Sequence, residues 1–387
     1  MKIVIAVDSF KESLASYEVA DCIEKGIKKV YVDAEIIKVP IADGGEGTVD
    51  ALVYGMGGRF VEVEVSNPLG ERINSKYGIL LDEKRAIIEM ATASGLALVA
   101  PQKRNPLKTT TYGTGEMIKD AIKKGCRRFI VGIGGSATND AGMGMMQALG
   151  MKFLDVHGQE VGEGGEALLK VAKIDGTKLL PELKMCQFLV ACDVNNPLYG
   201  LNGAAYVYAG QKGANEEMIE ELDAGLKHFS TVLKEYLSVD VSLVAGSGAA
   251  GGLGVAFLAF LNVELKSGIE IVLEEVQLQE KLDGADFVIT GEGRMDAQSL
   301  MGKAPVGVAK LAKLEGVPII SLSGAIADNS EELLHKEGID VLFSIMNAPM
   351  SLEEALNPEK TKVLVEKKTE EIFRLIKMVQ NHNTLNG

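Results

Sequence analysis

"KIVIAVDSFKESLASYEVADCIEKGIKKVYVDAEIIKVPIADGGEGT", Lys2–Thr48, is the stretch that decides the fold class. Its β-branched run at residues 2–7 ends in a polar loop, which predicts a buried parallel strand. Apolar residues at helical spacing follow over 14–30. A second apolar run, 34–39, leads to another loop and a helix at the end of the stretch. This repeated order of strand, loop and helix predicts a parallel sheet covered by helices.

The middle of the chain follows a different pattern. After Arg59, apolar and polar residues alternate on both sides of the turn sequence Asn67-Pro68-Leu69-Gly70, which predicts antiparallel hairpins. From Ala285 the order of strand, loop and helix returns. The segment 359–380 has the spacing of a long amphipathic helix. The two ends of the chain therefore share one pattern, and the middle has another.

These patterns predict two α/β domains within the 387 residues. The first is a Rossmann-like, doubly wound parallel-sheet domain that is discontinuous in sequence and comprises residues 1–62 and 284–387. The second is an inserted α/β domain with a mixed sheet, residues 63–283.

Composition excludes several classes of protein. The chain is 47% hydrophobic and 24% charged, which is typical of a globular enzyme, and its net charge of −14 argues against nucleic acid as a partner. No apolar run approaches the roughly 18 residues of a membrane span. The four cysteines and four histidines form no metal or redox motif, so we expect a reduced, cytoplasmic protein. Composition leaves the oligomeric state open.

Ligands of open α/β sheets bind at the carboxyl ends of the strands, so the loops after apolar runs are the candidate sites. In the first loop, Lys11 and Ser9 are candidates to hold an anion, and Asp8 to bond a hydroxyl or a metal's water shell. The alternative is a capping loop with a surface lysine. The second loop has glycines between two carboxylates, which favours close approach of a ligand over a plain acidic helix start. Its candidate residues are Asp43, Gly44, Gly45, Glu46 and Thr48.

A third candidate loop lies in "IVGIGGSATNDAGMGMMQALG", residues 130–150. Gly134 and Gly135 allow close approach to the backbone, Ser136 offers a hydroxyl, and Asp140 is a candidate metal ligand. The stretch matches neither G-x-x-x-x-G-K-[ST] nor G-x-G-x-x-G. A phosphate cradle at a helix start and a simple strand-to-helix turn are equally supported.

Two later loops complete the candidates. Asp193 follows the apolar run 187–192 and is placed either for general-base work or for an Asx turn. The loop within residues 290–307 has charges of both signs among glycines, which suits anion and Mg²⁺ handling better than a solvated loop. Its polar residues are Glu292, Arg294, Asp296, Gln298 and Lys303. Carboxylates, a few cations and glycine-rich loops together indicate a phosphotransferase.

Six motifs in order resemble the type-1 group of the bacterial glycerate kinase family: "DSFKESLAS", "PIADGGEGT", "GGSATNDAGMGMMQALG", "ACDVNNPLYG", "GSGAAGGLG" and "GEGRMDAQSLMGKAPVGVA". The resemblance covers nearly the whole chain. It implies ATP-dependent, Mg²⁺-dependent phosphorylation of D-glycerate, typically to 2-phosphoglycerate, and an active-site cleft between two α/β domains. The chain departs from the usual pattern at Glu12 and Ala141, where glycine is common, and at Gly210, where proline is common.

With this resemblance, the candidate residues take hypothetical roles. Lys11 and amides of the Asp43–Thr48 loop would hold the glycerate carboxylate, and Asp193 would act as general base. ATP phosphates would be bound by Gly134, Gly135 and Ser136, with Lys303 or Arg294. Mg²⁺ would be held by Asp140, Glu292 or Asp296. The alternatives are a kinase for a related hydroxy acid and a non-catalytic two-domain binding protein.

Overall fold

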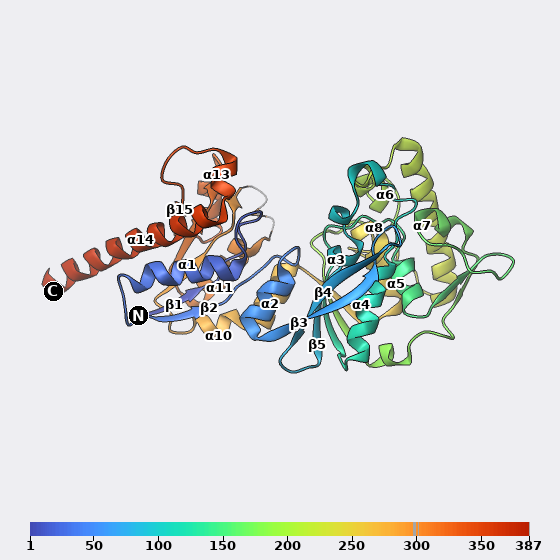
Figure 1. Ribbon diagram of the computed structural model, residues 1–387, viewed down its shortest axis with the longest axis horizontal. Helices are drawn as coiled ribbons and strands as arrows, with labels where there is room; N and C mark the ends of the chain where they lie inside the picture. The colour runs from blue at the N-terminus through green and yellow to red at the C-terminus, as the bar shows by residue number, and fades with distance from the viewer. Residues whose placement is uncertain (297–298, 301, 387) are drawn as a thin grey trace. The chain divides into compact units, whose positions relative to one another are not determined.

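The computed structural model describes residues 1–296, 299–300 and 302–386 (Figure 1), so Gln298 of the last candidate loop lies outside the described residues. Contacts group the chain into two compact units. Unit 1 comprises Met1–Asp43, Asp50–Gly57 and Ile269–Gly387, and unit 2 comprises Gly44–Val49 and Gly58–Gly268. The domain boundaries expected from the sequence stay a prediction, because contacts in a folded chain do not test which segments fold alone.

Unit 1 is built on five parallel strands, in the order β15-β13-β11-β1-β2. These strands are β1 (Lys2–Ile5), β2 (Glu35–Lys38), β11 (Phe287–Thr290), β13 (Ile319–Ser323) and β15 (Val341–Ser344). Numbered within this sheet, the order is 2-1-3-4-5, so the direction of winding reverses between β1 and β11. The predicted doubly wound parallel sheet is confirmed, and its switch point lies at the ends of β1 and β11. A two-stranded parallel ribbon, β12 (Arg294–Met295) and β14 (Ala325–Ile326), follows β11 and β13.

Helices cover this sheet, and the largest contact between them joins α1 to α14. The helices that lie wholly or mainly in unit 1 are α1 (Ser16–Lys28), α2 (Thr48–Met56), α9 (Gly268–Glu275), α10 (Leu278–Leu282), α11 (Ala304–Glu315), α12 (Glu331–Lys336), α13 (Leu352–Leu356) and α14 (Pro358–Asn386). Gly26 allows the close approach of α1 to α14, since a Cβ there would lie 2.6 Å from the Glu366 carbonyl oxygen.

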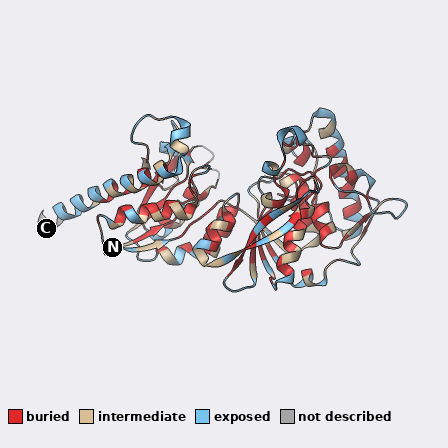
Figure 2. Ribbon diagram, viewed as in Figure 1, coloured by how far each residue is buried: buried red, intermediate tan, exposed pale blue. Residues whose placement is uncertain are grey.

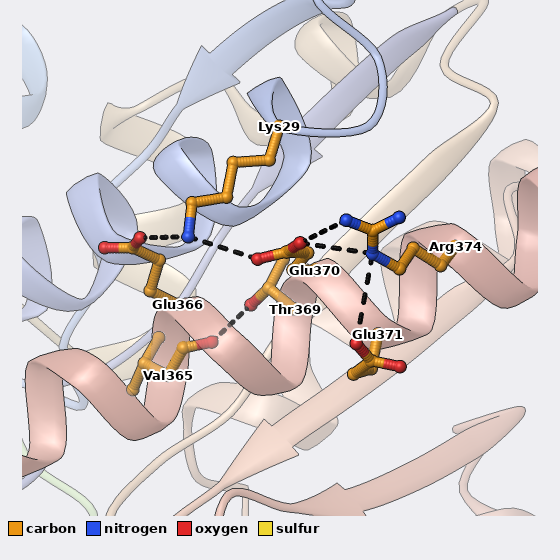
Figure 3. A network of polar contacts seen from close by, with 7 residues as sticks. All are labelled: Lys29, Val365, Glu366, Thr369, Glu370, Glu371 and Arg374. Carbon is orange, nitrogen blue, oxygen red and sulfur yellow. Dashed lines mark hydrogen bonds and ion pairs between the residues drawn. The ribbon is translucent and has the colours of Figure 1, made fainter.

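Charged side chains border the same contact. Figure 3 shows Lys29, just beyond α1, between two glutamates of α14, with Nζ 2.6 Å from Glu366 and 3.1 Å from Glu370. Arg374 reaches Glu370 from the next turn of α14 at 2.6 Å. The long amphipathic helix expected at the C-terminal end is thus confirmed, and its apolar face joins the core of unit 1 through residues such as Val365 and Phe373.

Unit 2 contains a six-stranded mixed sheet, in the order β10-β9-β6-β5-β4-β3. The strands are β3 (Gly58–Ser66), β4 (Arg72–Leu80), β5 (Arg85–Glu89), β6 (Arg128–Gly132), β9 (Gln187–Ala191) and β10 (Val263–Lys266). β3, β4 and β5 pair antiparallel, and β5, β6, β9 and β10 pair parallel. The predicted hairpin turn is confirmed, with Asn67 accepting the amides of Leu69 and Glu71 and with Gly70 at φ 80°.

The helices of unit 2 pack their apolar residues onto this sheet. They are α3 (Ala91–Ser94), α4 (Tyr112–Lys123), α5 (Met143–Ala148), α6 (Ala204–Tyr208), α7 (Glu216–Leu237) and α8 (Ala249–Phe260), beside the small antiparallel ribbon of β7 (Lys152–Leu154) and β8 (Lys173–Asp175). Figure 2 shows buried residues along the strands of both sheets and on the helices beside them. Among the described residues, no helix is long and apolar enough to cross a membrane.

Candidate active site

In unit 1, two carboxylates stand just beyond the strands of the switch point. Asp8 follows β1 and Glu292 follows β11, and they are 3% and 7% exposed. The loops that carry them are adjacent, because the Asp8 amide donates to the Gly291 carbonyl at 2.9 Å. The loops also approach closely at Gly293, where a Cβ would lie 3.3 Å from the Lys11 amide nitrogen. The topology thus brings together two loops that are nearly 300 residues apart in sequence, at the edge where open α/β sheets bind ligands.

Burial and neighbouring charge perturb both carboxylates. The pKa of Asp8 is raised to about 7, mainly by burial and also by the charges of Asp43 and Glu292, while the Ser9 amide and the Lys11 ammonium oppose the shift. The Ser9 amide donates to Asp8 Oδ1 at 2.6 Å. Burial also raises the pKa of Glu292, opposed by the hydroxyl of Ser299, which donates to its Oε1. Carboxyl groups with such perturbed pKa values in a loop cluster are typical of functional sites.

Cations border these carboxylates. Lys11 Nζ lies 3.8 Å from Asp43 Oδ2, and the lysine side chain is 57% exposed. Lys303 is the N-cap residue of α11 and lowers the pKa of Glu292 through its charge. Arg294 is mostly exposed, with Nε 3.8 Å from Asp296 Oδ2. Unit 1 therefore offers solvent-accessible cations and buried carboxylates side by side, which is the charge pattern that a bound anion and a divalent cation need.

In unit 2, the segment Gly44–Val49 lies across the carboxyl ends of the parallel strands. A Cβ on Gly44 would lie 2.6 Å from Gly268 Cα and 2.7 Å from Ala191 Cβ, and one on Gly132 would lie 2.4 Å from the Gly44 carbonyl oxygen. Other parts of the protein thus lie against Gly44, at the position where the sequence predicted that a ligand would approach the backbone.

The rest of this segment forms the start of α2. Thr48 is 1% exposed, and its hydroxyl donates to the Gly45 carbonyl at 2.7 Å. Glu46 is exposed. The Val49 amide donates to Oε1 of Glu89 at 2.8 Å. Glu89 is a buried carboxylate at the end of β5, and sequence reasoning missed it. The rule that ligand sites lie at strand ends could have found it in the run "RAIIEMA".

The glycine pair of the third loop presents free backbone donors. Gly134 and Gly135 are exposed, and Gly135 has φ 74°. Within the described part of the chain, the amides of Gly134, Gly135 and Ser136 donate to no protein acceptor, whereas the Gly135 carbonyl accepts from Leu96 at 2.8 Å. Successive free amides with one left-handed residue make an anion-binding concavity. The geometry therefore suits a phosphate cradle made of loop amides.

The expected helix start does not form this cradle. α5 begins at Met143, and Asp140 occupies its first amides: Oδ1 accepts from Gly142 at 3.1 Å and Oδ2 from Gly144 at 3.3 Å. Oδ2 also accepts from the amide and hydroxyl of Thr111, at 2.8 and 2.9 Å. Asp140 is 0% exposed, and burial raises its pKa against these bonds. The bonds give Asp140 a structural role as the cap of α5, while its role as a metal ligand stays an untested hypothesis.

Asp193 lies just beyond β9, at the same edge of the sheet. Its Oδ1 accepts from the Gly268 amide at 3.0 Å, which ties the loop to the segment after β10. The residue is exposed, so its carboxylate is reachable from solvent. The following asparagine pair is structural in part, since Asn196 accepts from the Tyr208 hydroxyl at 2.6 Å. An acidic group at a strand end, positioned by a backbone amide, fits the requirements of a general base.

The residues present fit a Mg²⁺ ion whose remaining ligands are nucleotide phosphates and water. Among the described residues there is no group of three Asp, Glu, His or Cys side chains arranged to hold a metal. Mg²⁺ in kinases is usually bound by one or two carboxylates together with phosphates and water. Glu292 and Asp296 would supply such carboxylates: the backbone amide of Asp296 donates to the Ser299 hydroxyl, which in turn donates to Glu292 Oε1.

Comparison with known proteins identifies the family. The profile of the "Glycerate kinase family" matches residues 3–377. The chain is 52% identical over 355 residues to the glycerate 2-kinase of Escherichia coli (strain K12), covering 92% of this chain and 93% of that protein. It is 49% identical to the glycerate kinase of Bacillus cereus (strain ATCC 10987 / NRS 248), with the same coverage. A crystal structure of a protein described as a candidate glycerate kinase 2 from Salmonella typhimurium LT2 superposes with a TM-score of 0.91 at 46% identity, covering 98% of this chain and 99% of that one. The chain belongs to the glycerate kinase family.

Proposed function

We propose that this protein transfers the terminal phosphoryl group of ATP to the C2 hydroxyl of D-glycerate, giving 2-phosphoglycerate and ADP. The observation that carries the proposal is the cluster of Asp8, Asp43, Glu292 and Lys11 at the switch point of a chain that belongs to the glycerate kinase family. Phosphoryl transfer depends on positioning and on neutralising charge, and these groups supply both.

The groups of each unit take separate roles in the proposal. In unit 1, Lys11 binds the glycerate carboxylate, Ser9 and Asp8 bond its hydroxyls, and Lys303 and Arg294 bind phosphate oxygens. In unit 2, the free amides of Gly134–Ser136 bind phosphate oxygens, and Asp193 takes the proton of the C2 hydroxyl. Glu292 and Asp296 would hold Mg²⁺, which supplies charge neutralisation at the phosphates when bound.

Asp193→Asn tests the assignment of the base. The Asn carbonyl oxygen can still accept from the Gly268 amide, so we expect the variant to fold like the wild type. Loss of a positioned base lowers the rate by roughly 10²–10⁴-fold. We therefore expect kcat to fall by that amount while the KM values change little. Near-wild-type turnover by the folded variant would show that another group takes the proton.

A substrate panel separates the proposed function from its alternatives. ADP release is measured with the full chain, ATP and Mg²⁺ in the presence of D-glycerate, tartronate, lactate or glycerol. We expect D-glycerate to be preferred and lactate to fail, because a site that bonds a second hydroxyl penalises an analogue that lacks it. Preference for another acid would make the protein a different hydroxy-acid kinase. No turnover with any of them, despite binding of glycerate, would indicate a binding protein.

A further inference from the structure

Lys212 is a fully buried cation that the proposed mechanism does not use. It ends the short helical turn Gly210–Lys212 in unit 2 and is 2% exposed. Its Nζ donates to the Thr138 carbonyl at 2.7 Å. Lysine is almost never buried to this extent unless it is paired. Burying this side chain costs free energy, so we expect its bond to Thr138 to have a specific structural role.

Thr138 belongs to the turn that presents the free amides of Gly134–Ser136. Two side chains from outside the turn hold its carbonyl groups: the Thr109 hydroxyl donates to Ala137 at 2.7 Å, and Lys212 donates to Thr138. The turn's own side chains contribute less, because the Thr138 hydroxyl and both amide atoms of Asn139 are buried without a partner among the described residues. A hydrogen bond from a charged donor is about twice as strong as one between neutral groups. In its ammonium form, Lys212 is therefore the stronger of the two side-chain restraints on the carbonyl groups of the turn.

The turn is also packed from one side, so its backbone has little freedom to adjust. Gly251 lies against it so closely that a Cβ there would be 2.0 Å from the Thr138 carbonyl oxygen. The buried charge of Lys212 is balanced by Asp140, which raises the lysine pKa while burial lowers it to about 7. Asp140 in turn holds the first amides of α5. Lys212 and Asp140 thus hold the turn at its carbonyl and at the start of the helix that follows it.

We propose that Lys212 is a positioning residue that sets the backbone of the turn Gly134–Asn139, and thereby the affinity of its amides for nucleotide phosphates. In this proposal Lys212 acts on the nucleotide through the backbone of the turn. The inference rests on the proposed function, in which these amides bind the phosphates of ATP.

Lys212→Met tests the inference, because methionine keeps much of the length of the side chain and removes the charge and the donor. Lys119→Met is the matched control: Lys119 donates to the carbonyl of Ala148, at the other end of α5. Calorimetry of the full chain with a non-hydrolysable ATP analogue and Mg²⁺ measures nucleotide binding, and steady-state kinetics measure KM for D-glycerate. We expect Lys212→Met to raise the Kd of the analogue by on the order of tenfold to a hundredfold, since small misplacements cost this much.

The KM for D-glycerate in Lys212→Met, and both constants in Lys119→Met, should stay within about twofold of the wild type. Lys212→Gln, whose carboxamide can still donate to Thr138, should recover part of the affinity. Wild-type affinity for the analogue in folded Lys212→Met would overturn the inference, as would an effect on D-glycerate alone. Wild-type protein that binds the analogue without D-glycerate-dependent ADP release would instead contradict the proposed function.

A measurement on the wild type covers the case in which these variants do not fold. The Nζ resonance of Lys212, observed with ¹⁵N-labelled lysine, should shift when the ATP analogue binds and stay in place when D-glycerate binds alone. An Nζ resonance that is unchanged by the analogue would contradict coupling between Lys212 and the phosphate site.

Discussion

At the level of one residue, the buried carboxyl group of Asp8 lowers the folding stability of the protein as the pH rises. Its pKa is raised from 3.8 to about 7, so between these values the unfolded chain loses a proton that the folded protein keeps. Folding stability therefore falls as pH rises through this window, by up to about 1.4 kcal/mol per pH unit, and levels off above it. A carboxylate retained at this cost is typical of a functional site.

Asp8→Asn should remove this cost, because the Asn carboxamide stays neutral and its oxygen can still accept from the Ser9 amide. We expect a higher midpoint of denaturant unfolding than in the wild type, with a gain at about pH 8 that exceeds the gain at about pH 5 by roughly 2 kcal/mol. Activity with D-glycerate should fall in the same variant. An unfolding midpoint that shifts equally at both pH values would show that the buried carboxyl is not the titrating group.

Glu12 and Ala141, the two positions where the chain lacks the glycine common in the family, both adopt left-handed backbone conformations. Their φ angles are 65° and 52°. A residue with a Cβ costs about 1–2 kcal/mol in this conformation, which explains why glycine is the usual residue there. Glu12 is also exposed, so its charge faces solvent beside Lys11.

Glu12→Gly should therefore raise the free energy of unfolding by about 0.5–1 kcal/mol, after allowance for the flexibility that glycine adds to the unfolded chain. Lys25→Gly, an exposed position within α1, is the control and should lower it by about 1 kcal/mol. Denaturant unfolding of both variants measures the two signs. Destabilisation by Glu12→Gly would mean that the glutamate side chain makes a contact worth more than the backbone strain.

At the level of elements, the close approach of α1 to α14 requires a glycine at position 26. Gly26→Ala would place a methyl group 2.6 Å from the Glu366 carbonyl oxygen and 2.7 Å from Thr369 Cβ, so the helices must move apart. We expect a loss of about 1–3 kcal/mol. The matched variant is Gly55→Ala in α2, where the nearest atom is 3.5 Å away and the gain should be about 0.5–1 kcal/mol. Opposite shifts of the unfolding midpoint would support this packing, and equal shifts would contradict it.

Elements with a strong local pattern could be predicted from the sequence, whereas the start of α5 could not. The buried strands, the Asn67 turn and the long C-terminal helix each follow from periodicity or turn chemistry within a few residues. The stretch 130–150 predicted a helix after its polar residues, but not which groups bond the first amides of that helix. The helix begins at Met143, where Asp140 accepts from the amides of Gly142 and Gly144 and the Thr111 hydroxyl accepts from the Met145 amide. The bond from Met145 to Thr111 joins residues 34 apart in sequence, so it leaves no local signal.

For the whole molecule, the sequence predicted two α/β parts and an interrupted first part, because the pattern at the two ends differs from that of the middle. It did not predict that Gly44–Val49 belongs with unit 2 while the residues on both sides belong with unit 1. The segment Gly44–Val49 belongs with unit 2 because the backbone of Gly44 packs against Gly268 and the Val49 amide bonds to Glu89. These partners lie between 40 and more than 200 residues away, where neither periodicity nor motif spacing can indicate them.

The central claim is phosphorylation of D-glycerate at C2, and a proton-coupled ³¹P spectrum of the product tests it most directly. The full chain is incubated with ATP, Mg²⁺ and D-glycerate. A phosphate on C2 couples to one carbon-bound proton and gives a doublet, whereas a phosphate on C3 couples to two and gives a triplet. We predict a new doublet that grows with ADP and is absent without D-glycerate. A triplet would contradict the position of transfer, and no new ester signal would contradict the activity itself.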